Sequence, residues 1–488
     1  MTSIMLSKSK YLNGLQCPRY LWVLLHEPER VPGPDVVTQH RFDQGHQVDV
    51  LARKLFPDGI DIPAEDFAEN LRQTKELLQR CVPLFQAGFR AGKVYSRADI
   101  LNPAGEDRWD IIEVKSSTGI KDEYYEDVSF QKFCYEKSGV KIRKSFLAYI
   151  NNKYVKHGDI DPRQLFTVED ISDVVEEVSS GIQERIDSIL AIVAAGQCPE
   201  VAIGRHCNAP YGCPLQQECW GFLPESNVFE LYRGGGKSFE LLESGVLAIR
   251  DIPGYFKLSG KQQIQRVCAI SSEPYIDKRE IRHFLGTLRY PLYYLDFETF
   301  STAVPLFDGT RPYQKIPFQF SLHVVERENG EPKHYSFLAE GTQDPRPELL
   351  SQLRKVLGEQ GSIAVYSQTF EKEVLKGLGE AFPDSRGWAD DVLERVVDLL
   401  SPFRNFCYYH PAQKGSASLK AVLPALTGRG YEGMAISGGE EASIAFLEAT
   451  YGDVSPEERM KIREDLEKYC GRDTEGMIWI VDRLRELA

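Results

Sequence analysis

Apolar and polar positions alternate over short stretches of this chain, and KVYSRADILNPAGEDRWDIIEVKSS is the clearest example. Two segments rich in apolar residues flank the turn NPAGED, which predicts a β-hairpin near residues 93–117. Because strand side chains alternate between faces, Glu113 and Lys115 are expected on one face. Ile112 and Val114 are then expected on the other.

A second pattern begins at YPLYYLDFETF, where aromatic and aliphatic residues predict a buried strand over residues 290–300. Strand and helix patterns then alternate to the end of the chain, which favours an α/β domain. The last helix is expected to start at Ser455, with Pro456 in its first turn and Glu458 completing a capping box.

These patterns divide the chain into three zones, and its 488 residues suggest two to four domains. Residues 1–222 form one expected domain, and residues 286–488 form the α/β domain. The zone between them, residues 223–285, combines a Gly-rich turn with short helical segments, so a helical connector is expected there.

The composition favours a soluble protein. Apolar residues make up 42% of the sequence, and no stretch approaches the roughly 18 apolar residues that span a bilayer. The amino-terminal segment lacks the uninterrupted apolar core of a signal peptide, so a cytoplasmic protein without membrane contact is expected. The net charge of −14 argues against coating nucleic acid electrostatically. It does not exclude an enzyme whose carboxylates bind metal ions.

Three cysteines recur at equal intervals in RHCNAPYGCPLQQECW, residues 205–220. In a reducing compartment, clustered cysteines are expected to bind a metal and scattered ones to be small buried hydrophobic residues. The clustered class comprises Cys207, Cys213 and Cys219. The scattered class comprises Cys81, Cys134, Cys268, Cys407 and Cys470.

The predicted hairpin carries residues suited to phosphodiester chemistry. Asp99 lies on its first strand, and Glu113 and Lys115 lie on its second. Two carboxylates can hold Mg²⁺ or Mn²⁺, and an adjacent lysine can orient the attacking water or stabilise the charged phosphorane. The alternative is an exposed, charged strand face without catalytic function.

This arrangement resembles the PD-(D/E)XK nuclease superfamily, and specifically its RecB-like branch, which includes the CRISPR-associated exonucleases with an iron-sulfur cluster. The resemblance covers the first expected domain and implies a restriction-endonuclease-like α/β fold. It implies a metal-binding histidine on an upstream helix, matched by His46 in FDQGHQVDVLA. It also implies a QxxxY motif, matched by Gln131 and Tyr135, which would share one helix face because they are four apart.

The same resemblance implies that Cys17, in GLQCPRYLW, joins the three regularly spaced cysteines around a [4Fe-4S] cluster. Such a cluster would link the two ends of the nuclease domain. Four thiolates satisfy Zn²⁺ as well, but the wide Cys-x5-Cys-x5-Cys spacing differs from the short knuckles typical of structural zinc. A zinc site, disulfides, and Cys198 or His206 in place of one ligand are the alternatives.

The last expected domain carries a second group of acids. In YYLDFETF, Asp296 and Glu298 lie two apart on the predicted strand, so both carboxylates leave the same face. Glu371, in VYSQTFEKEVL, opens a helix after a short apolar strand. Tyr469 and Asp473, four apart on the last helix, share one face.

The order of these motifs resembles the DEDD 3′–5′ exonucleases of the ribonuclease H-like fold, in the subgroup with a tyrosine. There, four acids bind two Mg²⁺ or Mn²⁺ ions that activate water, and the tyrosine, matched here by Tyr469, positions that water. The pattern expects aspartate at the position of Glu371, whose longer side chain must still reach the metal. Asp398 fits the next strand as a structural residue, and Lys420 is expected near the path of a substrate strand.

The whole chain also resembles a large bacterial family that combines both domains. The expected function is a metal-dependent nuclease with a second 3′–5′ exonuclease-like site and with DNA, rather than RNA, as substrate. The alternative is a nucleic-acid-binding protein in which one or both sites are degenerate. The connector segment ELLESGVLAIRDIP is similar to helix-hairpin-helix modules that grip a DNA phosphate, but its glycine pattern is incomplete. A plain spacer is the alternative there.

Overall fold

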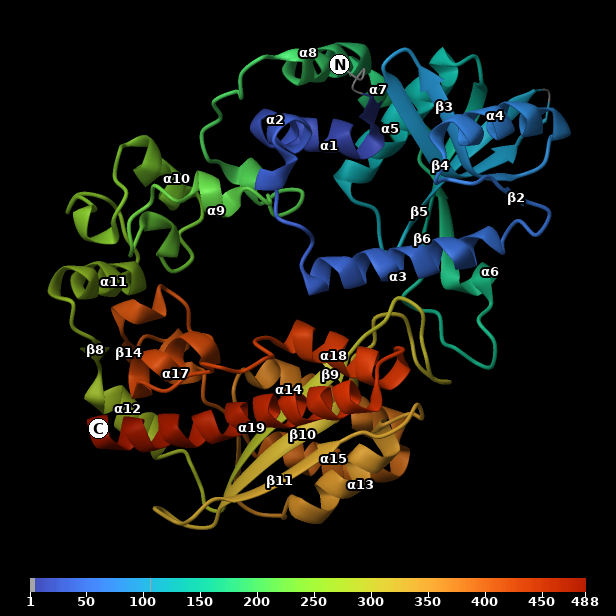
Figure 1. The fold of residues 1–488 in the computed structure, drawn as a ribbon. Helices are drawn as coiled ribbons and strands as arrows, with labels where there is room; N and C mark the ends of the chain where they lie inside the picture. The colour runs from blue at the N-terminus through green and yellow to red at the C-terminus, as the bar shows by residue number, and fades with distance from the viewer. Residues whose placement is uncertain (1–4, 106) are drawn as a thin grey trace. The chain divides into compact units, whose positions relative to one another are not determined.

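The computed structural model describes residues 5–105 and 107–488 and divides the chain into two compact units. The first unit contains the described residues up to Gly221 together with 302–314, and the second contains 222–301 and 315–488. Both units mix helices with strands (Figure 1), so the α/β class expected from the sequence is confirmed. The connector belongs to the second unit.

A seven-stranded mixed sheet forms the centre of the first unit. Its strands are β1 (Leu6–Ser7), β2 (Ile60–Asp61), β3 (Leu84–Ala91), β4 (Val94–Pro103), β5 (Arg108–Lys115), β6 (Lys141–Ile150) and β7 (Phe166–Asp170). The order is β2-β3-β4-β5-β6-β7, with β1 paired to β4. Strands β3 to β5 form an antiparallel meander, and β6 runs parallel to β5. This parallel step needs a crossover, which helix α5 (Asp122–Lys137) provides.

The predicted hairpin is formed by β4 and β5, which pair antiparallel. Ile111 belongs to the core that contains α5, whereas Ile112 and Val114 pack with helix α3 (Val36–Arg53) on the other face. Because Glu113 alternates with Ile112 and Val114, it lies on the face of α5. The alternation predicted for this strand is therefore confirmed.

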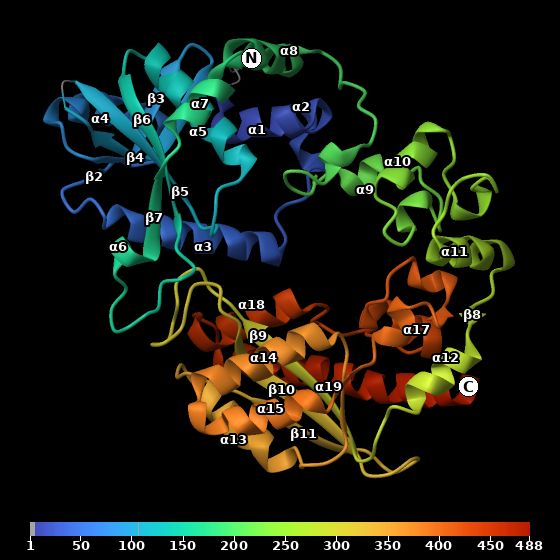
Figure 2. The same ribbon diagram turned by 180° about the vertical axis from the view of Figure 1, so that it is seen from behind.

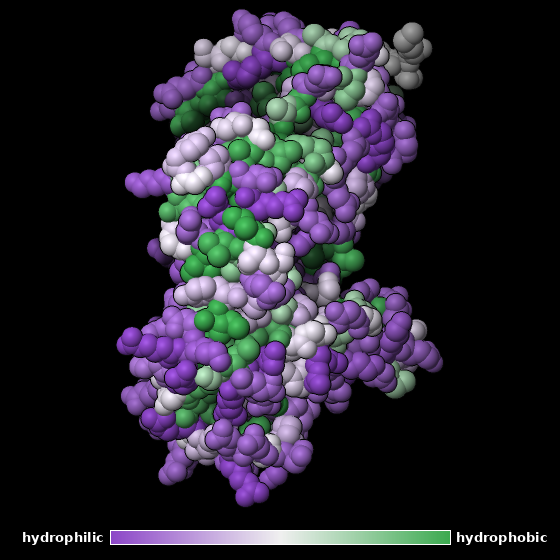
Figure 3. Space-filling model, turned by 90° about the vertical axis from the view of Figure 1, so that its left-hand side faces the viewer, coloured by the Kyte–Doolittle hydropathy of each residue, from purple (hydrophilic) through white to green (hydrophobic). Residues whose placement is uncertain are grey.

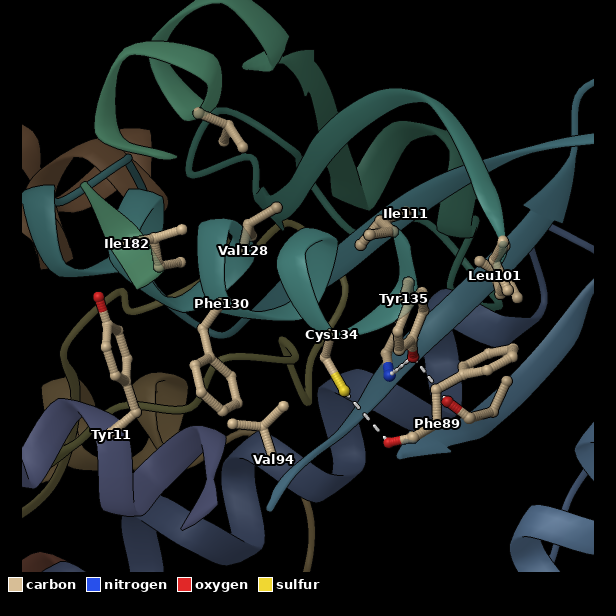
Figure 4. Packing of buried hydrophobic residues seen from close by; sticks show 14 of the residues in the cluster. Tyr11, Phe89, Val94, Leu101, Ile111, Val128, Phe130, Cys134, Tyr135 and Ile182 are labelled. Carbon is tan, nitrogen blue, oxygen red and sulfur yellow. Dashed lines mark hydrogen bonds between the residues drawn. The ribbon is translucent and has the colours of Figure 1, made fainter. Parts of the chain in front are cut away.

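Helix α5 packs on the sheet through an aromatic and aliphatic core, which Figure 4 shows. Phe130 stacks on Tyr11 with ring centroids 4.8 Å apart, and this contact joins α5 to helix α1 (Lys8–Gln16). Cys134 is fully buried, and its thiol donates a hydrogen bond to the carbonyl of Phe89 at 3.3 Å. Cys134 is therefore the small buried residue that its isolation in the sequence predicts.

The other helices of the first unit cover the sheet and lead to the cysteine segment. They are α2 (Pro18–His26), α4 (Phe67–Leu77), α6 (Pro162–Leu165), α7 (Ser172–Ser179), α8 (Ile182–Ala194) and α9 (Gln216–Cys219). Helices α1 and α2 are separated by Cys17 alone, which is extended at φ −156° and ψ 116°. Pro18 then starts α2, a position that tolerates proline because its missing N–H needs no partner.

The segment 302–314 follows a strand of the second unit but packs within the first. The backbone N–H of Ala303 donates to Oε1 of Gln44 at 2.8 Å, and Lys156 pairs with Asp308 at 2.7 Å. Ala303 also belongs to the hydrophobic cluster under α3. The sequence alone did not predict this exchange of a segment.

A five-stranded sheet forms the centre of the second unit. Its strands are β9 (Leu292–Phe300), β10 (Ile316–Val325), β11 (Lys333–Leu338), β12 (Ser362–Val365) and β13 (Val396–Asp398). The order is β11-β10-β9-β12-β13, in which β11, β10 and β9 are antiparallel and β12 runs parallel to β9 and β13. The strand predicted from YPLYYLDFETF is therefore the central strand, β9.

Helix α19 (Pro456–Leu487) runs along one face of this sheet. It begins as predicted, because the Ser455 hydroxyl accepts a hydrogen bond from the N–H of Glu458 at 3.1 Å and Pro456 is in the first turn. Figure 2 shows helices α13 to α15 on the opposite face. The helices before α19 are α13 (Arg346–Val356), α14 (Gln368–Ala381), α15 (Arg386–Glu394), α16 (Ser401–Arg404), α17 (Leu419–Thr427) and α18 (Gly439–Tyr451).

The connector forms a small helical subdomain of the second unit around Val228, Leu241 and Ile249. Its helices are α10 (Gly236–Glu243), α11 (Gly260–Ser271) and α12 (Lys278–Leu285), and its strand β8 (Tyr275–Ile276) pairs with β14 (Tyr408–Tyr409). After α10, Gly245 takes a φ of +76° and a 3-10 turn follows instead of a second helix. The likeness of this stretch to a helix-hairpin-helix is therefore limited to one helix and one turn.

Hydrophilic side chains dominate the face drawn in Figure 3, with hydrophobic ones scattered among them. Within residues 5–105 and 107–488, no helix is long and apolar enough to cross a bilayer. Among the scattered cysteines, Cys268 is buried as expected. Cys81 is exposed and Cys407 is half-buried, which corrects the expectation for both. Cys81 ends a 3-10 turn at a left-handed bend of the chain, which turns its side chain to solvent.

Candidate metal centres

Glu113 is the most heavily bonded carboxylate of the first unit. Its Oε1 accepts from the Lys115 ammonium at 2.7 Å and from the Lys8 ammonium at 2.6 Å. Its Oε2 accepts from Nε2 of Gln131 at 2.7 Å. Burial opposes the ionisation of Glu113, but Lys115 and Lys8 together hold its pKa below the usual range. The side chains of Lys8, Lys115 and Gln131 therefore all donate to the buried carboxylate of Glu113.

Asp127 links the same side chains from helix α5. It accepts from the Lys115 ammonium at 2.6 Å and from Gln131 at 3.0 Å, and Lys8 lies 3.4 Å away. Burial works against the charge of Lys115, yet Asp127 and Glu113 raise its pKa well above the usual value. Lys115 is therefore a fixed cation in the metal-free protein.

Asp99 lies across the hairpin from Glu113 and is held by the backbone. Its Oδ2 accepts from the N–H of Val114 at 2.9 Å, and its Oδ1 accepts from Gln86 at 3.2 Å. Burial, reinforced by the negative charge of Glu113, raises the pKa of Asp99 to about 7. An acid with this pKa exchanges its proton for a cation near neutral pH.

Helix α3 adds a further acid beside this pair. Asp49 lies one turn after His46 and forms an ion pair with Arg53. Burial raises the pKa of Asp49, and the negative charge of Glu113 raises it further. Arg53 and His46 act in the opposite direction, so Asp49 is within electrostatic reach of both His46 and Glu113. His46 itself is exposed. On the same helix, Asp49 is therefore more buried than His46.

The hydroxyl of Tyr135 forms hydrogen bonds to two strands of the sheet. Its hydroxyl donates to the carbonyl of Ala87 at 2.6 Å and accepts from the N–H of Ala98 at 2.5 Å. Ala87 and Ala98 are paired across β3 and β4, and Tyr135 is fully buried. Tyr135 therefore links β3 to β4, the strand that carries Asp99.

Sequence reasoning missed three side chains of this site. Asp127 had a signal, because it precedes Gln131 and Tyr135 at the same spacing of four on one helix. Asp49 had a weaker signal, one helical turn after His46. Lys8 had none, because it lies in a polar stretch, LSKSK, far from the hairpin in sequence.

The cysteine centre contains residues from near the start of the first unit and from the segment that ends at Gly221. Cys17 lies between α1 and α2, Cys207 ends a 3-10 turn (Arg205–Cys207), and Cys219 ends α9. The N–H of Cys213 donates to the carbonyl of Cys207 at 2.8 Å. Gln16, next to Cys17, donates to the carbonyls of His206 at 2.9 Å and Tyr211 at 2.7 Å. The amino-terminal helix is thereby tied to the cysteine loop.

Neighbouring thiols of this centre influence the pKa of Cys213. Burial raises the pKa of Cys213 to about 11, and the neighbouring thiols that add to this effect are Cys17, Cys207 and Cys219. Cys198 faces Arg19 and Arg30 instead, which lower its pKa after burial has raised it. The structure therefore groups the four cysteines that the sequence predicts. His206 is also adjacent, with Nε2 3.7 Å from the sulfur of Cys207.

The spacing of the four sulfurs bears on the group that they fit. All four residues are described, and no three of their sulfurs lie within 4.8 Å of one another. Around tetrahedral Zn²⁺, with Zn–S bonds of about 2.3 Å, neighbouring sulfurs would be about 3.8 Å apart. A cubane cluster separates its ligands further, because an eight-atom core lies between them. Four thiols are a donor set that both Zn²⁺ and a [4Fe-4S] cluster accept.

The second unit brings together acids from a strand and a helix. Asp296, Glu298 and Cys470 each present one ligand atom, and these atoms lie within 4.8 Å of one another. The Cys470 thiol donates to Oδ2 of Asp296 at 3.6 Å. Cys470 is buried, as its isolation in the sequence predicts, but its contact with Asp296 corrects its interpretation as a hydrophobic packing residue. It follows Tyr469 on α19, which lies against β9.

Asp473 lies one helical turn beyond Tyr469 and accepts a hydrogen bond from the Tyr431 hydroxyl. Asp296, Asp473 and Tyr469 line one side of a pocket of about 580 Å³. The rest of the lining includes Tyr366, Arg404 and Lys420, together with Tyr232 and Arg233 from the connector. The pocket therefore combines carboxylates with aromatic and cationic side chains.

Glu371 is the acid whose identity departs from the expected pattern. It lies in the first turn of α14 and is 1% exposed, and its Oε2 has no hydrogen-bond partner among the described residues. Burial raises the pKa of Glu371 to about 8, and Asp398 and Asp473 add to this effect. Asp398 accepts from the N–H groups of Ser367 and Leu400, both at 3.0 Å, which matches the structural role expected for it.

The acids of this centre destabilise one another's charged forms. Burial raises the pKa of Asp296 well above the usual value, and Asp473, Glu298 and Glu371 add to this shift. Burial and Asp473 likewise raise the pKa of Glu298. Burial raises the pKa of Asp473 to about 6, although Tyr431 and Lys420 act against it. A bound divalent cation would relieve this repulsion.

Lys420 is a cation that acts on two of these acids. Its ammonium donates to the carbonyl of Ser437 and lies 5.1 Å from the ring centroid of Tyr469 and 5.8 Å from that of Tyr431. Its charge lowers the pKa of Glu298 and of Asp473. Lys420 thus lines the same pocket as Asp296 and Asp473, and its position near a substrate strand stays a prediction.

Comparisons with known proteins cover part of the chain. Residues 293–418 match a family described as a domain of unknown function (DUF2779). The uncharacterized protein MG366 homolog of Mycoplasma pneumoniae is 26% identical over 208 residues, which is 38% of this chain and 31% of that protein. The uncharacterized protein MG366 of Mycoplasma genitalium is 24% identical over 213 residues, which is 40% of this chain and 32% of that protein. The matched region spans about a third of the length of these relatives.

Proposed function

We propose that this chain is a metal-dependent nuclease that hydrolyses phosphodiester bonds of nucleic acid, with DNA as its substrate. The first unit would have the PD-(D/E)XK restriction-endonuclease-like arrangement, and the second the ribonuclease H-like arrangement of a DEDD 3′–5′ exonuclease. The observation that carries this proposal is the convergence of buried carboxylates from β9, α14 and α19 beside one pocket.

The chemistry of the pocket supports a nucleic-acid substrate. Asp296, Glu298, Glu371 and Asp473 are the residues that would hold Mg²⁺ or Mn²⁺, which, when bound, activates water and stabilises the leaving oxygen. Among the described residues, Arg233 and Arg404 have no carboxylate partner, so both guanidinium groups are free to contact phosphate. Tyrosine rings in the same lining offer faces on which a base can stack.

The first unit supports a second phosphodiesterase site. Asp99, Glu113 and the exposed His46 are the residues that would hold the metal, and Lys115 stands beside Glu113 with its charge fixed. Gln131 orients Glu113 from α5. Since Lys115 contacts both Glu113 and Asp127, its ammonium is held where it can orient water or neutralise charge on a phosphate.

The cysteine centre is proposed to be structural. Its residues lie at the two ends of the first unit, so a [4Fe-4S] cluster held by them would close a loop of nearly the whole unit. The hydrogen bonds of Gln16 to the cysteine loop already join the same ends. The cluster would therefore stabilise the fold on which Asp99 and Glu113 are positioned.

The proposal is tested with full-length protein purified anaerobically. The protein is incubated with Mg²⁺ or Mn²⁺ and end-labelled single- and double-stranded DNA and RNA, alongside Lys115→Ala, Asp296→Asn and the combined variant. We expect metal-dependent cleavage that each single variant reduces and the combined variant abolishes. Equal cleavage by the parent and the combined variant would show that neither site is catalytic. No cleavage of any substrate would instead favour a nucleic-acid-binding protein with degenerate sites.

A further inference from the structure

Cys470 is the residue of the second centre that the acidic motifs do not explain. Its sulfur lies 3.6 Å from Oδ2 of Asp296, and one oxygen of Glu298 completes a group within 4.8 Å. Two ligands of one tetrahedral ion, with bonds of about 2.0–2.3 Å, lie about 3.3–3.8 Å apart. A small inward shift of side chains would therefore place all three atoms on a single ion.

The position of Cys470 is fixed by the helix that carries it. It lies in the middle of α19, between Tyr469 and Asp473, and it is fully buried. Its thiol donates to a carboxylate rather than to the carbonyl one turn earlier in its own helix. Its counterpart in the first unit, Cys134, donates instead to a backbone carbonyl, which is the ordinary arrangement for a buried thiol.

A separate observation indicates that a cation belongs at this position. Glu371 is 1% exposed and its Oε2 has no hydrogen-bond partner among the described residues. Strand β12 runs parallel to β9 and leads into α14, so Glu371, in the first turn of α14, lies at the same edge of the sheet as Asp296 and Glu298. A buried carboxylate oxygen without a donor costs free energy that a bound cation would recover.

We propose that Cys470, Asp296 and Glu298 together bind one divalent ion of the Zn²⁺ or Co²⁺ class in preference to Mg²⁺. Thiolate is a soft ligand that Mg²⁺ avoids, whereas Co²⁺ and Zn²⁺ accept mixed sulfur and oxygen donors. Binding replaces the S–H bond with a sulfur–metal bond, and the proton passes to solvent. The inference rests on the proposed function and narrows it: of the two ions expected at this carboxylate centre, the one that Cys470 contacts is of the Zn²⁺ or Co²⁺ class.

Cobalt is the probe for this site, because a cobalt–thiolate bond gives a charge-transfer absorption that a cobalt–carboxylate bond lacks. Co²⁺ is titrated into the full-length protein after the cysteine centre has been filled during anaerobic purification. We expect one equivalent to produce the band, and we expect the band to be lost in Cys470→Ser. The Kd for Co²⁺ should rise at least about tenfold, while the Kd for Mg²⁺ changes less than about twofold.

Cys268→Ser is the matched control, since Cys268 is also buried in the second unit but lies among apolar neighbours. This variant should keep the full cobalt band. Asp296→Asn keeps the thiol and should lose the band, so it tests the site even where Cys470→Ser fails to fold. An undiminished band in either Cys470→Ser or Asp296→Asn would overturn the inference.

The two proposals can fail separately. A cobalt band that depends on Cys470, in a protein that cleaves no nucleic acid, would leave the metal site in place and reject the nuclease function. Nuclease activity with no absorption that depends on Cys470 would do the reverse. In that case the thiol would be a hydrogen-bond donor to Asp296 and nothing more.

Discussion

The ammonium of Lys8 lies 2.6 Å from Oε1 of Glu113, although 105 positions separate the two residues in the chain. Lys115 contacts the same oxygen at 2.7 Å. Two cations on one carboxylate oxygen would compete with a divalent ion, since like charges repel strongly where water is scarce. In the metal-free protein, Lys8 therefore supplies part of the charge that a bound ion would supply.

Lys8→Met should strengthen Mn²⁺ binding at the first centre, because it removes one of the competing charges. The metal-free protein should lose about 1.5–3 kcal/mol of stability, the usual contribution of a hydrogen bond to a charged group. Mn²⁺ affinity is measured by calorimetry in an Asp296→Asn background, which silences the second centre. Lys10→Met is the control, since among the residues that the structure describes the ammonium of Lys10 donates only to the carbonyl of Met5. A weaker or unchanged Mn²⁺ affinity in Lys8→Met would contradict this account.

Residues that are close in sequence were predictable, because strand and helix periodicity fixes their directions. The alternation of β5 placed Glu113 and Lys115 together, and the spacing of four placed Tyr469 and Asp473 on one face of α19. The central strand β9 was predicted from its apolar run alone. Each of these predictions needed only local backbone geometry.

The contacts that were not predictable join residues distant in sequence. Lys8 reaches Glu113 only because β1 pairs with β4 and α1 starts directly after it. Cys470 reaches Asp296 only because α19 lies against β9. No local pattern encodes either packing, and a buried cysteine without cysteine neighbours carries the same sequence signal as a core residue.

Cys17→Ser should lower both the iron content and the thermal stability of the first unit. A cluster bound at both ends closes a loop of about 200 residues, and losing such a closure costs about 4–5 kcal/mol if it acts as a disulfide does. The midpoint of unfolding should fall by about 10 °C. Iron, acid-labile sulfide and zinc are measured together with circular dichroism, and Cys198→Ser is the control. Stoichiometric zinc without iron in the parent would contradict the iron-sulfur assignment.

Arg233→Ala and Arg404→Ala should weaken the binding of single-stranded DNA without altering the metal centre. Both side chains line the pocket, and neither has a carboxylate partner among the described residues. A lost contact between guanidinium and phosphate should raise KM about tenfold with little change in kcat. The dependence of log Kd on log salt should become shallower by about 0.7 for each substitution.

Arg279→Ala is the matched control for the arginine variants. Arg279 is exposed on α12 and lies outside the pocket lining, so its loss should change neither KM nor the salt dependence. A fall in kcat alone for Arg233→Ala or Arg404→Ala would indicate a disturbed metal centre rather than a phosphate contact. Equal effects for all three variants would show that the pocket arginines act only through the overall charge of the protein and make no specific phosphate contact.

Glu371→Asp should alter metal binding at the second centre, because it shortens the side chain by one methylene at the position where the exonuclease pattern has aspartate. The buried Oε2 of Glu371 has no protein donor within the described residues, so the substitution disrupts no hydrogen bond there. We expect exonuclease activity at 3′ ends to increase, as measured by release of labelled mononucleotides. Glu371→Gln, which keeps the length but loses the charge, should lower activity and serves as the control. Equal activity in the parent and both variants would show that Glu371 does not contact the metal.

Metal binding at the second centre should strengthen as pH rises from 6 to 8. Burial raises the pKa of Asp473 to about 6 and that of Glu371 to about 8, so these carboxyls hold protons that a metal must displace. The affinity for Mn²⁺ should increase about tenfold or more across this range. Calorimetry in buffers of different ionisation enthalpy measures the affinity and the number of protons released.

The same pKa values set the pH dependence of stability without metal. Both carboxyls have folded pKa values above their unfolded values, so their stabilising effect is complete below about pH 4 and is lost as pH rises through about 6 and 8. The unfolding midpoint of the metal-free protein should therefore fall between pH 4 and 8 relative to that of an Asp296→Asn, Asp473→Asn variant, in which part of the repulsion is absent. Added Mn²⁺ should raise the parent's midpoint most at pH 8. A midpoint that does not respond to Mn²⁺, or that responds equally in the double variant, would remove the second metal centre and leave only the fold.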